Sequence, residues 1–210
     1  MKGLLLKDWY AIKSYCLYTL FIVLVFAILG GAMQGNFFFT FYPLIFISVI
    51  AMNLIAYEEK EKWDQYAATL PYTKAQIVSS KYIVSLCLGL GTVVLSGISQ
   101  YVGMIVSNTY NTEKLLSYLM IFVSLALLPA AFLLPFIYKF GVNKGRIAYY
   151  VVIIVSCGVI GGIASVDSIG SASAVSASQI SIFVIVAVAS AVIYALSWML
   201  SIRFYQNREI

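Results

Sequence analysis

The sequence predicts an all-α membrane protein with six transmembrane helices. The first observation is composition: 62% of the 210 residues are hydrophobic and only 10% are charged, whereas about a quarter of an average soluble domain is charged. The second is the spacing of the charges, which leaves long uncharged segments. The third is the gathering of bases on one predicted side of the membrane. Together these observations exclude a disordered chain, a disulfide-stapled secreted domain and a nucleic-acid reader.

The uncharged segments define the expected helices. They cover 14–57, 82–112, 115–138, 147–166 and 168–202. Because one helix needs roughly 20 apolar residues to cross the hydrocarbon layer, the first segment, of 44 residues, holds two helices hinged at Gln34-Gly35-Asn36. The last segment opens with a stretch rich in serine, alanine and glycine and has room for one helix. The predicted spans are 14–33, 38–57, 82–107, 116–137, 147–165 and 181–202.

The bases predict how these spans are oriented. An even number of spans puts both termini on one side, and twelve of the 13 Lys and Arg residues fall there, with Lys114 on the other side. Cytoplasmic loops carry such an excess of bases, so both termini are expected in the cytoplasm. Topology and attraction to anionic lipid then explain the formal net charge of +5.

The absence of histidine excludes several kinds of chemistry. The chain has no His-based metal site, no Ser–His or Cys–His nucleophile and no His proton relay, and no metal site is expected. No Asp, Glu, Lys or Arg falls inside a predicted span, which argues against an ion- or proton-coupled transporter. Asn53, Ser96 and Gln100 are polar residues of the spans that can line a translocation path. The alternative is that they form hydrogen bonds between helices.

Residues 2–13 predict a short amphipathic helix before the first span. Leu5, Trp9 and Ile12 share one face, and Lys7 and Asp8 lie opposite. A tryptophan at this position suggests a helix that lies among the lipid headgroups. The alternative is that this segment is simply the start of the first span.

The connector between the second and third spans predicts a cytoplasmic helix. Trp63, Tyr66 and Leu70 fall at i, i+3 and i+7 and give one aromatic and apolar face, and Pro71 ends the helix. A short rigid helix with an exposed aromatic face can dock on a cytoplasmic protein and move the spans with it. The alternative is that it rests on lipid.

Two further pairs of side chains flank this helix. Glu58 and Lys62 can pair at i, i+4. Thr73 and Gln76 have the spacing of a capping box, which starts a new helix that continues into the third span.

Two stretches of the chain resemble the small permeases of ABC-2 type transporters. The first, Leu5-Leu6-Lys7-Asp8-Trp9, precedes the first span. The second and more specific one is Thr69-Leu70-Pro71-Tyr72-Thr73-Lys74-Ala75-Gln76-Ile77-Val78-Ser79-Ser80-Lys81-Tyr82. With the six-span layout, the resemblance covers the whole chain, 1–210, as one permease domain. Within that group the chain is most similar to bacterial peptide exporters, such as permeases for phenol-soluble modulins and lantibiotic immunity.

The resemblance implies which segments contact a partner. Residues 1–13 would be the interfacial helix on the inner leaflet, and 58–72 would contain the coupling helix, seated in a groove of an ATP-binding subunit. When the family's coupling helix is placed on this sequence, it runs from Glu59 to Leu70. The residues expected to couple to the ATPase are Glu59, Trp63, Asp64, Tyr66, Leu70 and Pro71.

The same resemblance implies a transport subunit that is not itself an enzyme. The chain contains no G-x-x-x-x-G-K-[ST] phosphate loop, so no cofactor is expected on it, and ATP and magnesium belong to a separate ATPase. The permease would act as a dimer, with a second copy or a paralogue, in the bacterial cytoplasmic membrane. An uncharged interior suits an amphipathic or hydrophobic peptide. A lipophilic drug is the alternative cargo, and a membrane immunity or interaction protein is the alternative function.

Overall fold

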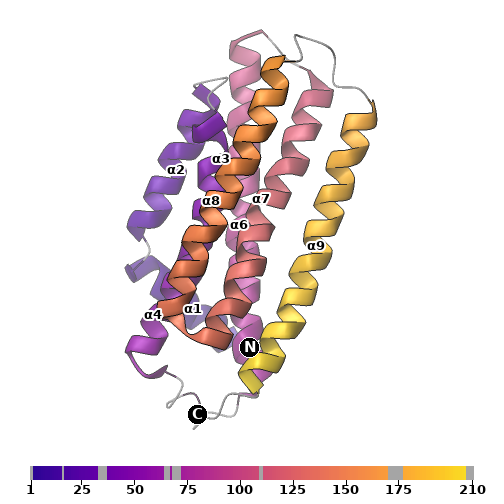
Figure 1. Cartoon of the computed structure of the whole chain (residues 1–210). Helices are drawn as coiled ribbons and strands as arrows, with labels where there is room; N and C mark the ends of the chain where they lie inside the picture. Colours follow the sequence, from indigo (N-terminus) through magenta and orange to yellow (C-terminus); the bar gives the residue numbers. More distant parts are fainter. Residues whose placement is uncertain are drawn as a thin grey trace.

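The computed structural model describes residues 2–15, 17–32, 37–63, 67, 72–108, 111–169 and 177–206. In these ranges all regular structure is helical, as predicted, and no strand is present. The helices are α1 (Lys2–Tyr15), α2 (Leu17–Ala32), α3 (Phe37–Phe46), α4 (Ser48–Lys60), α6 (Lys74–Val106), α7 (Thr112–Phe140), α8 (Val142–Ile169) and α9 (Ala177–Gln206). Figure 1 shows the long helices side by side in one bundle, with α1 at the same end as the last turns of α9.

Several of these helices are long and apolar enough to cross a membrane. Among the described residues, four stretches qualify: Phe41–Lys60, Lys74–Val106, Leu115–Phe140 and Ser181–Gln206. A fifth results if Gly3–Ser14 and Leu17–Gly30, which are bent by 75° relative to each other, count as one span. The predicted span 147–165 falls on α8. The number six and the side that the termini face remain predictions.

The start of α6 is set by a capping box, as the sequence predicts. The Thr73 side chain accepts a hydrogen bond from the Gln76 N–H at 3.3 Å, and Gln76 Oε1 accepts one from the Thr73 N–H at 3.2 Å. Each side chain therefore satisfies a backbone donor that the first turn of a helix leaves free. This fixes the register of α6 at the end of the bundle where the candidate site lies.

The prolines do not interrupt α7. From the sequence, Pro129 and Pro135 predict a kink or a break, and the structure shows no break in α7 between Thr112 and Phe140. Because Pro135 has no N–H, the carbonyl of Ala131, four residues earlier, lacks its helical donor. The Ser197 hydroxyl of α9 donates to that carbonyl at 2.6 Å. A neighbouring helix thus supplies the hydrogen bond that proline removes, as the membrane interior requires.

The largest core cluster lies between α6, α7 and α9, around the fully buried Tyr82. Its hydroxyl shares hydrogen bonds with Ser197 Oγ at 2.8 Å and Ser201 Oγ at 2.6 Å. Its ring stacks on Trp198, with the ring centres 5.7 Å apart. These contacts hold the first turns of α6 against α9. They therefore also position Lys81, the residue before Tyr82.

Candidate functional site

Four charged side chains meet where α1, α4 and α6 come together. Lys81 Nζ lies 2.5 Å from Asp8 Oδ1 and 2.6 Å from Glu58 Oε1. Lys7 also pairs with Glu58, and its Nζ lies 3.5 Å from Asp8 Oδ1. Glu58 therefore pairs with bases on other helices, and the predicted pair with Lys62 is wrong. We call these two acids and two bases, which join three helices, the charge cluster.

The centre of the charge cluster is buried. Asp8 is 0% exposed and Lys81 is 2% exposed. Burying an ion costs several kcal/mol, which the attraction of its partner offsets only in good geometry. Asp8 Oδ1 has such a partner, whereas Asp8 Oδ2 is buried without a hydrogen bond among the described residues. Removing Lys81 would leave the buried Asp8 with only the more distant ammonium group of Lys7, at 3.5 Å.

Helix α1 buries Asp8, which the sequence places on its polar face. The sequence places Asp8 opposite Leu5, Trp9 and Ile12, but Asp8 shares the buried side with Ile12, whereas Trp9 is 62% exposed and Leu5 is half-buried. The reason is the ion pair with Lys81, a partner on another helix that makes burial of the carboxylate possible. The bend between α1 and α2 means that α1 does not continue the first span in a straight line. Its place among lipid headgroups stays a prediction.

The connector between α4 and α6 begins with a break in the helix. Glu59 belongs to the last turn of α4, which ends at Lys60, and Lys62 has a φ of +53°. Because this left-handed conformation interrupts a helix, the structure contradicts one unbroken helix from Glu59 to Leu70. Four of the predicted coupling residues lie outside the described residues: Asp64, Tyr66, Leu70 and Pro71.

Glu59, a predicted coupling residue, stabilises the start of α8. Its Oε2 accepts a hydrogen bond from the N–H of Val142, the first residue of α8, at 3.2 Å. A carboxylate at this place satisfies a free N–H and compensates the positive end of the helix dipole. Gly141 makes the preceding turn with a φ of +81°, which glycine adopts without strain. Glu59 therefore ties α4 to the turn between α7 and α8.

Trp63 lies against the charge cluster. Lys7 Nζ lies 3.8 Å from the centre of the Trp63 ring, a cation–π contact. The ring is half-buried and packs against the core between α6, α7 and α9. The predicted exposed aromatic face is therefore wrong for Trp63, because this ring finds both a cation and an apolar surface inside the protein. Through Lys7, the first part of the connector contacts α1.

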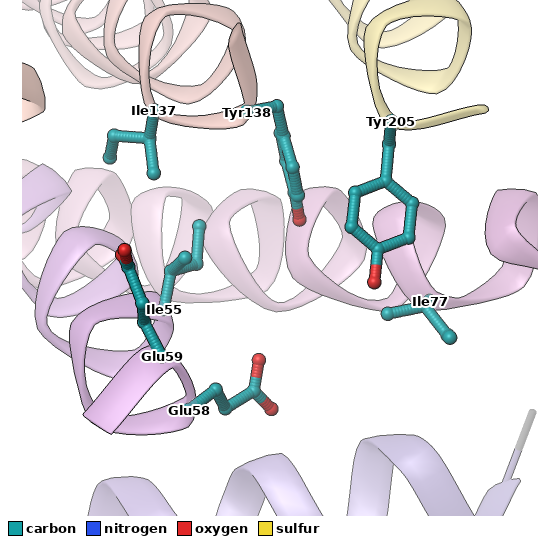
Figure 2. A pocket seen from close by; sticks show the side chains of 7 residues that line it. All are labelled: Ile55, Glu58, Glu59, Ile77, Ile137, Tyr138 and Tyr205. Carbon is teal, nitrogen blue, oxygen red and sulfur yellow. The ribbon is translucent and has the colours of Figure 1, made fainter. Parts of the chain in front are cut away.

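A small cavity adjoins the charge cluster. Its lining residues are Ile55, Glu58, Glu59, Ile77, Ile137, Tyr138 and Tyr205. Figure 2 shows Tyr138 and Tyr205 pointing from α7 and α9 toward the side on which Glu58 lies. Its volume of about 30 Å³ holds one or two water molecules. The cavity can hydrate the edge of the cluster and is too small for a peptide.

The family of the chain follows from a match to a family model. A model described as "ABC-2 family transporter protein" matches residues 3–206. The chain belongs to the ABC-2 transporter family. No curated protein and no solved structure matches it. Together with the long apolar helices, membership makes the chain a multi-pass membrane component of a transporter and not a catalytic subunit.

The three residues of this ABC-2 protein that were predicted to line a translocation path, Asn53, Ser96 and Gln100, differ from one another in their surroundings. Gln100 Nε2 donates to the Gly30 carbonyl, in the last turn of α2, at 3.0 Å. Gln100 therefore forms a hydrogen bond between helices, the alternative that the sequence left open. Ser96 is buried and its Oγ has no hydrogen bond among the described residues, and Asn53 is half-buried. Their role in a path stays a prediction.

Sequence reasoning did not assign a role to Lys81, although a signal was present. Lys81 follows Ile77 and Val78 at i+4 and i+3 and precedes Ser85 at i+4, so between 77 and 85 it is the one charged residue on this stripe of α6. A base in the middle of such a stripe indicates a buried acidic partner, because an unpaired ammonium group there is costly. In this ABC-2 protein, the buried acidic partner of Lys81 is Asp8.

Gln100→Leu is expected to lower the free energy of unfolding by about 1–2 kcal/mol, since it removes the hydrogen bond from the Gln100 side chain to the Gly30 carbonyl. The measurement is the thermal unfolding of the purified protein in detergent. Ser99→Ala, which removes a longer bond of 3.4 Å to the Ile28 carbonyl, is the matched control and should have a smaller effect. Unchanged stability with altered transport would instead place Gln100 in the path.

Proposed function

We propose that the chain is the permease subunit of an ATP-driven ABC exporter in the bacterial cytoplasmic membrane. The family match over 3–206 supports the transport role. The chain has no phosphate-loop sequence, which supports a separate ATP-binding subunit that holds ATP and magnesium. A second copy of the permease, or a paralogue, completes the transporter.

The observation that carries this proposal is the link between the connector and the charge cluster. Glu58 precedes the connector, and Trp63 within it contacts Lys7 of α1. Lys81, in α6 after the connector, bonds to both acids of the cluster. A partner that moves the connector therefore moves α1, α4 and α6 together. An ATPase docked on the coupling region, 58–72, needs this transfer of motion to drive the spans.

An amphipathic or hydrophobic peptide is the cargo that this interior suits best. The ion pairs that join Lys7, Asp8, Glu58 and Lys81 lie at one end of the bundle. The polar side chains deeper in α6, such as Thr92 and Ser96, are uncharged. A small ion would need an ionisable partner in the spans, whereas an amphipathic peptide needs apolar surface and hydrogen bonds. A lipophilic compound is the alternative cargo.

Trp63→Ala is expected to weaken coupling between the permease and its ATPase. The substitution removes the aromatic contact with Lys7 and loosens the connector from α1. The measurement is co-purification of the tagged chain with the ATP-binding subunit encoded beside it, followed by the ATPase rate of the complex in liposomes. We expect the wild-type chain to retain the subunit, and Trp63→Ala to lower the ATPase rate several-fold. Tyr18→Ala, at a side chain 80% exposed on α2, is the matched control and should behave as wild type.

Two outcomes of this experiment contradict different parts of the proposal. A wild-type chain that never retains an ATP-binding subunit contradicts the permease function and favours a non-transport immunity or interaction protein. If the subunit is retained but Trp63→Ala has the same ATPase rate as Tyr18→Ala, the permease function stands and the coupling role of Trp63 is lost.

A further inference from the structure

Two lysines and two phenylalanines gather where α7 turns into α8. Lys139 Nζ lies 5.2 Å from the ring centre of Phe140 and 5.2 Å from that of Phe204, on α9. Lys144 Nζ, in the first turn of α8, lies 6.0 Å from the ring centre of Phe140. We call these four residues the basic corner. Two ammonium groups thus share one aromatic ring at the end of three long helices.

The basic corner lies where two apolar stretches of the chain end. The apolar stretch Leu115–Phe140 ends at this corner, and Ser181–Gln206 ends two residues after Phe204. Phe140 is 44% exposed, so an apolar ring stands beside the ammonium groups at the membrane boundary. Long basic side chains and aromatic rings occur together where a protein contacts both hydrocarbon and phosphate.

The two lysines of the basic corner differ from those of the charge cluster in their partners. Neither Lys139 nor Lys144 has a carboxylate within 4 Å in the part of the chain that the structure describes. Glu59, whose carboxylate reaches this turn, bonds to the Val142 N–H. Neither ammonium group is therefore in an ion pair within these residues, and an anion is the group that complements them.

We propose that the basic corner binds the phosphate of an anionic glycerophospholipid. The two ammonium groups contact the phosphodiester, and Phe140 and Phe204 contact the glycerol and the upper part of an acyl chain. The contacts of the lysines with the two rings hold the ammonium groups at this depth. A zwitterionic lipid has the same phosphate, but its own cation competes with the lysines, so the site selects lipids with a net negative charge. This inference does not depend on the proposed export function.

The test compares lipids that differ only in headgroup. The purified full-length chain in detergent is titrated with phosphatidylglycerol or phosphatidylcholine of identical acyl chains, and bound lipid is counted by native mass spectrometry. We expect tighter binding of phosphatidylglycerol. Lys139→Gln with Lys144→Gln is expected to weaken that binding about 30-fold, because each base near the anionic surface contributes about 1 kcal/mol. Inorganic phosphate at the same concentration should not displace the lipid, since it lacks the acyl chains.

Matched variants keep the result interpretable. Lys60→Gln with Lys62→Gln removes the same charge at two exposed side chains and should retain phosphatidylglycerol binding. Lys139→Arg with Lys144→Arg keeps the charge and should retain it as well, even if the Gln variant folds poorly. Equal binding of the two lipids, or equal loss in the two Gln variants, overturns the proposal. The proposal is also overturned if the variant with Lys139→Gln and Lys144→Gln binds lipid normally but no longer retains the ATP-binding subunit. The basic corner would then be a protein-docking surface.

Discussion

Lys81→Met is expected to be among the most destabilising single substitutions in the chain, at about 3–5 kcal/mol. The ammonium group lies 2.5 Å from Asp8 Oδ1, and Asp8 is 0% exposed. Methionine fills similar volume but leaves the carboxylate buried without its nearest cation. The measurement is reversible unfolding in mixed detergent micelles, followed by tryptophan fluorescence, with the free energy of unfolding compared with wild type.

A paired substitution distinguishes charge from packing. Asp8→Leu with Lys81→Met replaces the ion pair by apolar side chains and leaves Glu58 paired with Lys7. Replacing a whole buried ion pair is often neutral, so the double variant should recover most of the stability. If it is as unstable as the sum of the two single variants, the loss arises from packing and the electrostatic explanation is wrong. With stability recovered, the ATPase rate of the double variant reports whether the charge cluster also transmits motion.

Tyr82→Ala is expected to cost about 3–5 kcal/mol, the range for truncating a buried aromatic side chain. Its ring is fully buried between α6 and α9, where it stacks on Trp198. Tyr82→Phe keeps the ring and removes the bonds to Ser197 and Ser201, so it should cost only about 1–2 kcal/mol. The same unfolding experiment measures both variants.

The control for Tyr82 is an aromatic residue outside the core. Tyr150 is 62% exposed on α8, and Tyr150→Ala should change the free energy of unfolding little. Equal losses for Tyr82→Ala and Tyr82→Phe would mean that the hydroxyl carries the whole effect. Equal losses for Tyr82→Ala and Tyr150→Ala would contradict the central place of Tyr82 in the core.

Local signals in the sequence predicted much of the helical framework. The absence of charge from 82 to 112 predicted the long apolar α6, because a helix in hydrocarbon must be apolar along its length. Thr73 and Gln76 predicted where α6 begins, since a capping box involves residues only three positions apart. Both features depend on neighbours in the chain and can be derived without knowing how the helices pack.

The packing of side chains between helices could not be predicted in the same way. Asp8 was placed on the polar face of α1 because its partner, Lys81, is 73 residues away and periodicity within one helix says nothing about it. Likewise, Trp63 was expected on an exposed face, but Lys7 and the core offer it a better environment. The break at Lys62 needs a left-handed backbone conformation, for which this non-glycine residue gives no sequence signal.

The hydrogen bond from Ser197 to the Ala131 carbonyl has a consequence for how the transporter can move. Hydrocarbon offers no donor to replace Ser197, so separating α9 from α7 would strand a carbonyl that Pro135 already deprives of its helical bond. The two helices therefore act as a fixed frame. Tyr149 of α8 belongs to the same core cluster as Met52 of α4 and Leu133 of α7. A rearrangement that keeps α7 and α9 in contact preserves the bond to Ser197, whereas a movement of α8 relative to α4 breaks the bond from the Val142 N–H to Glu59.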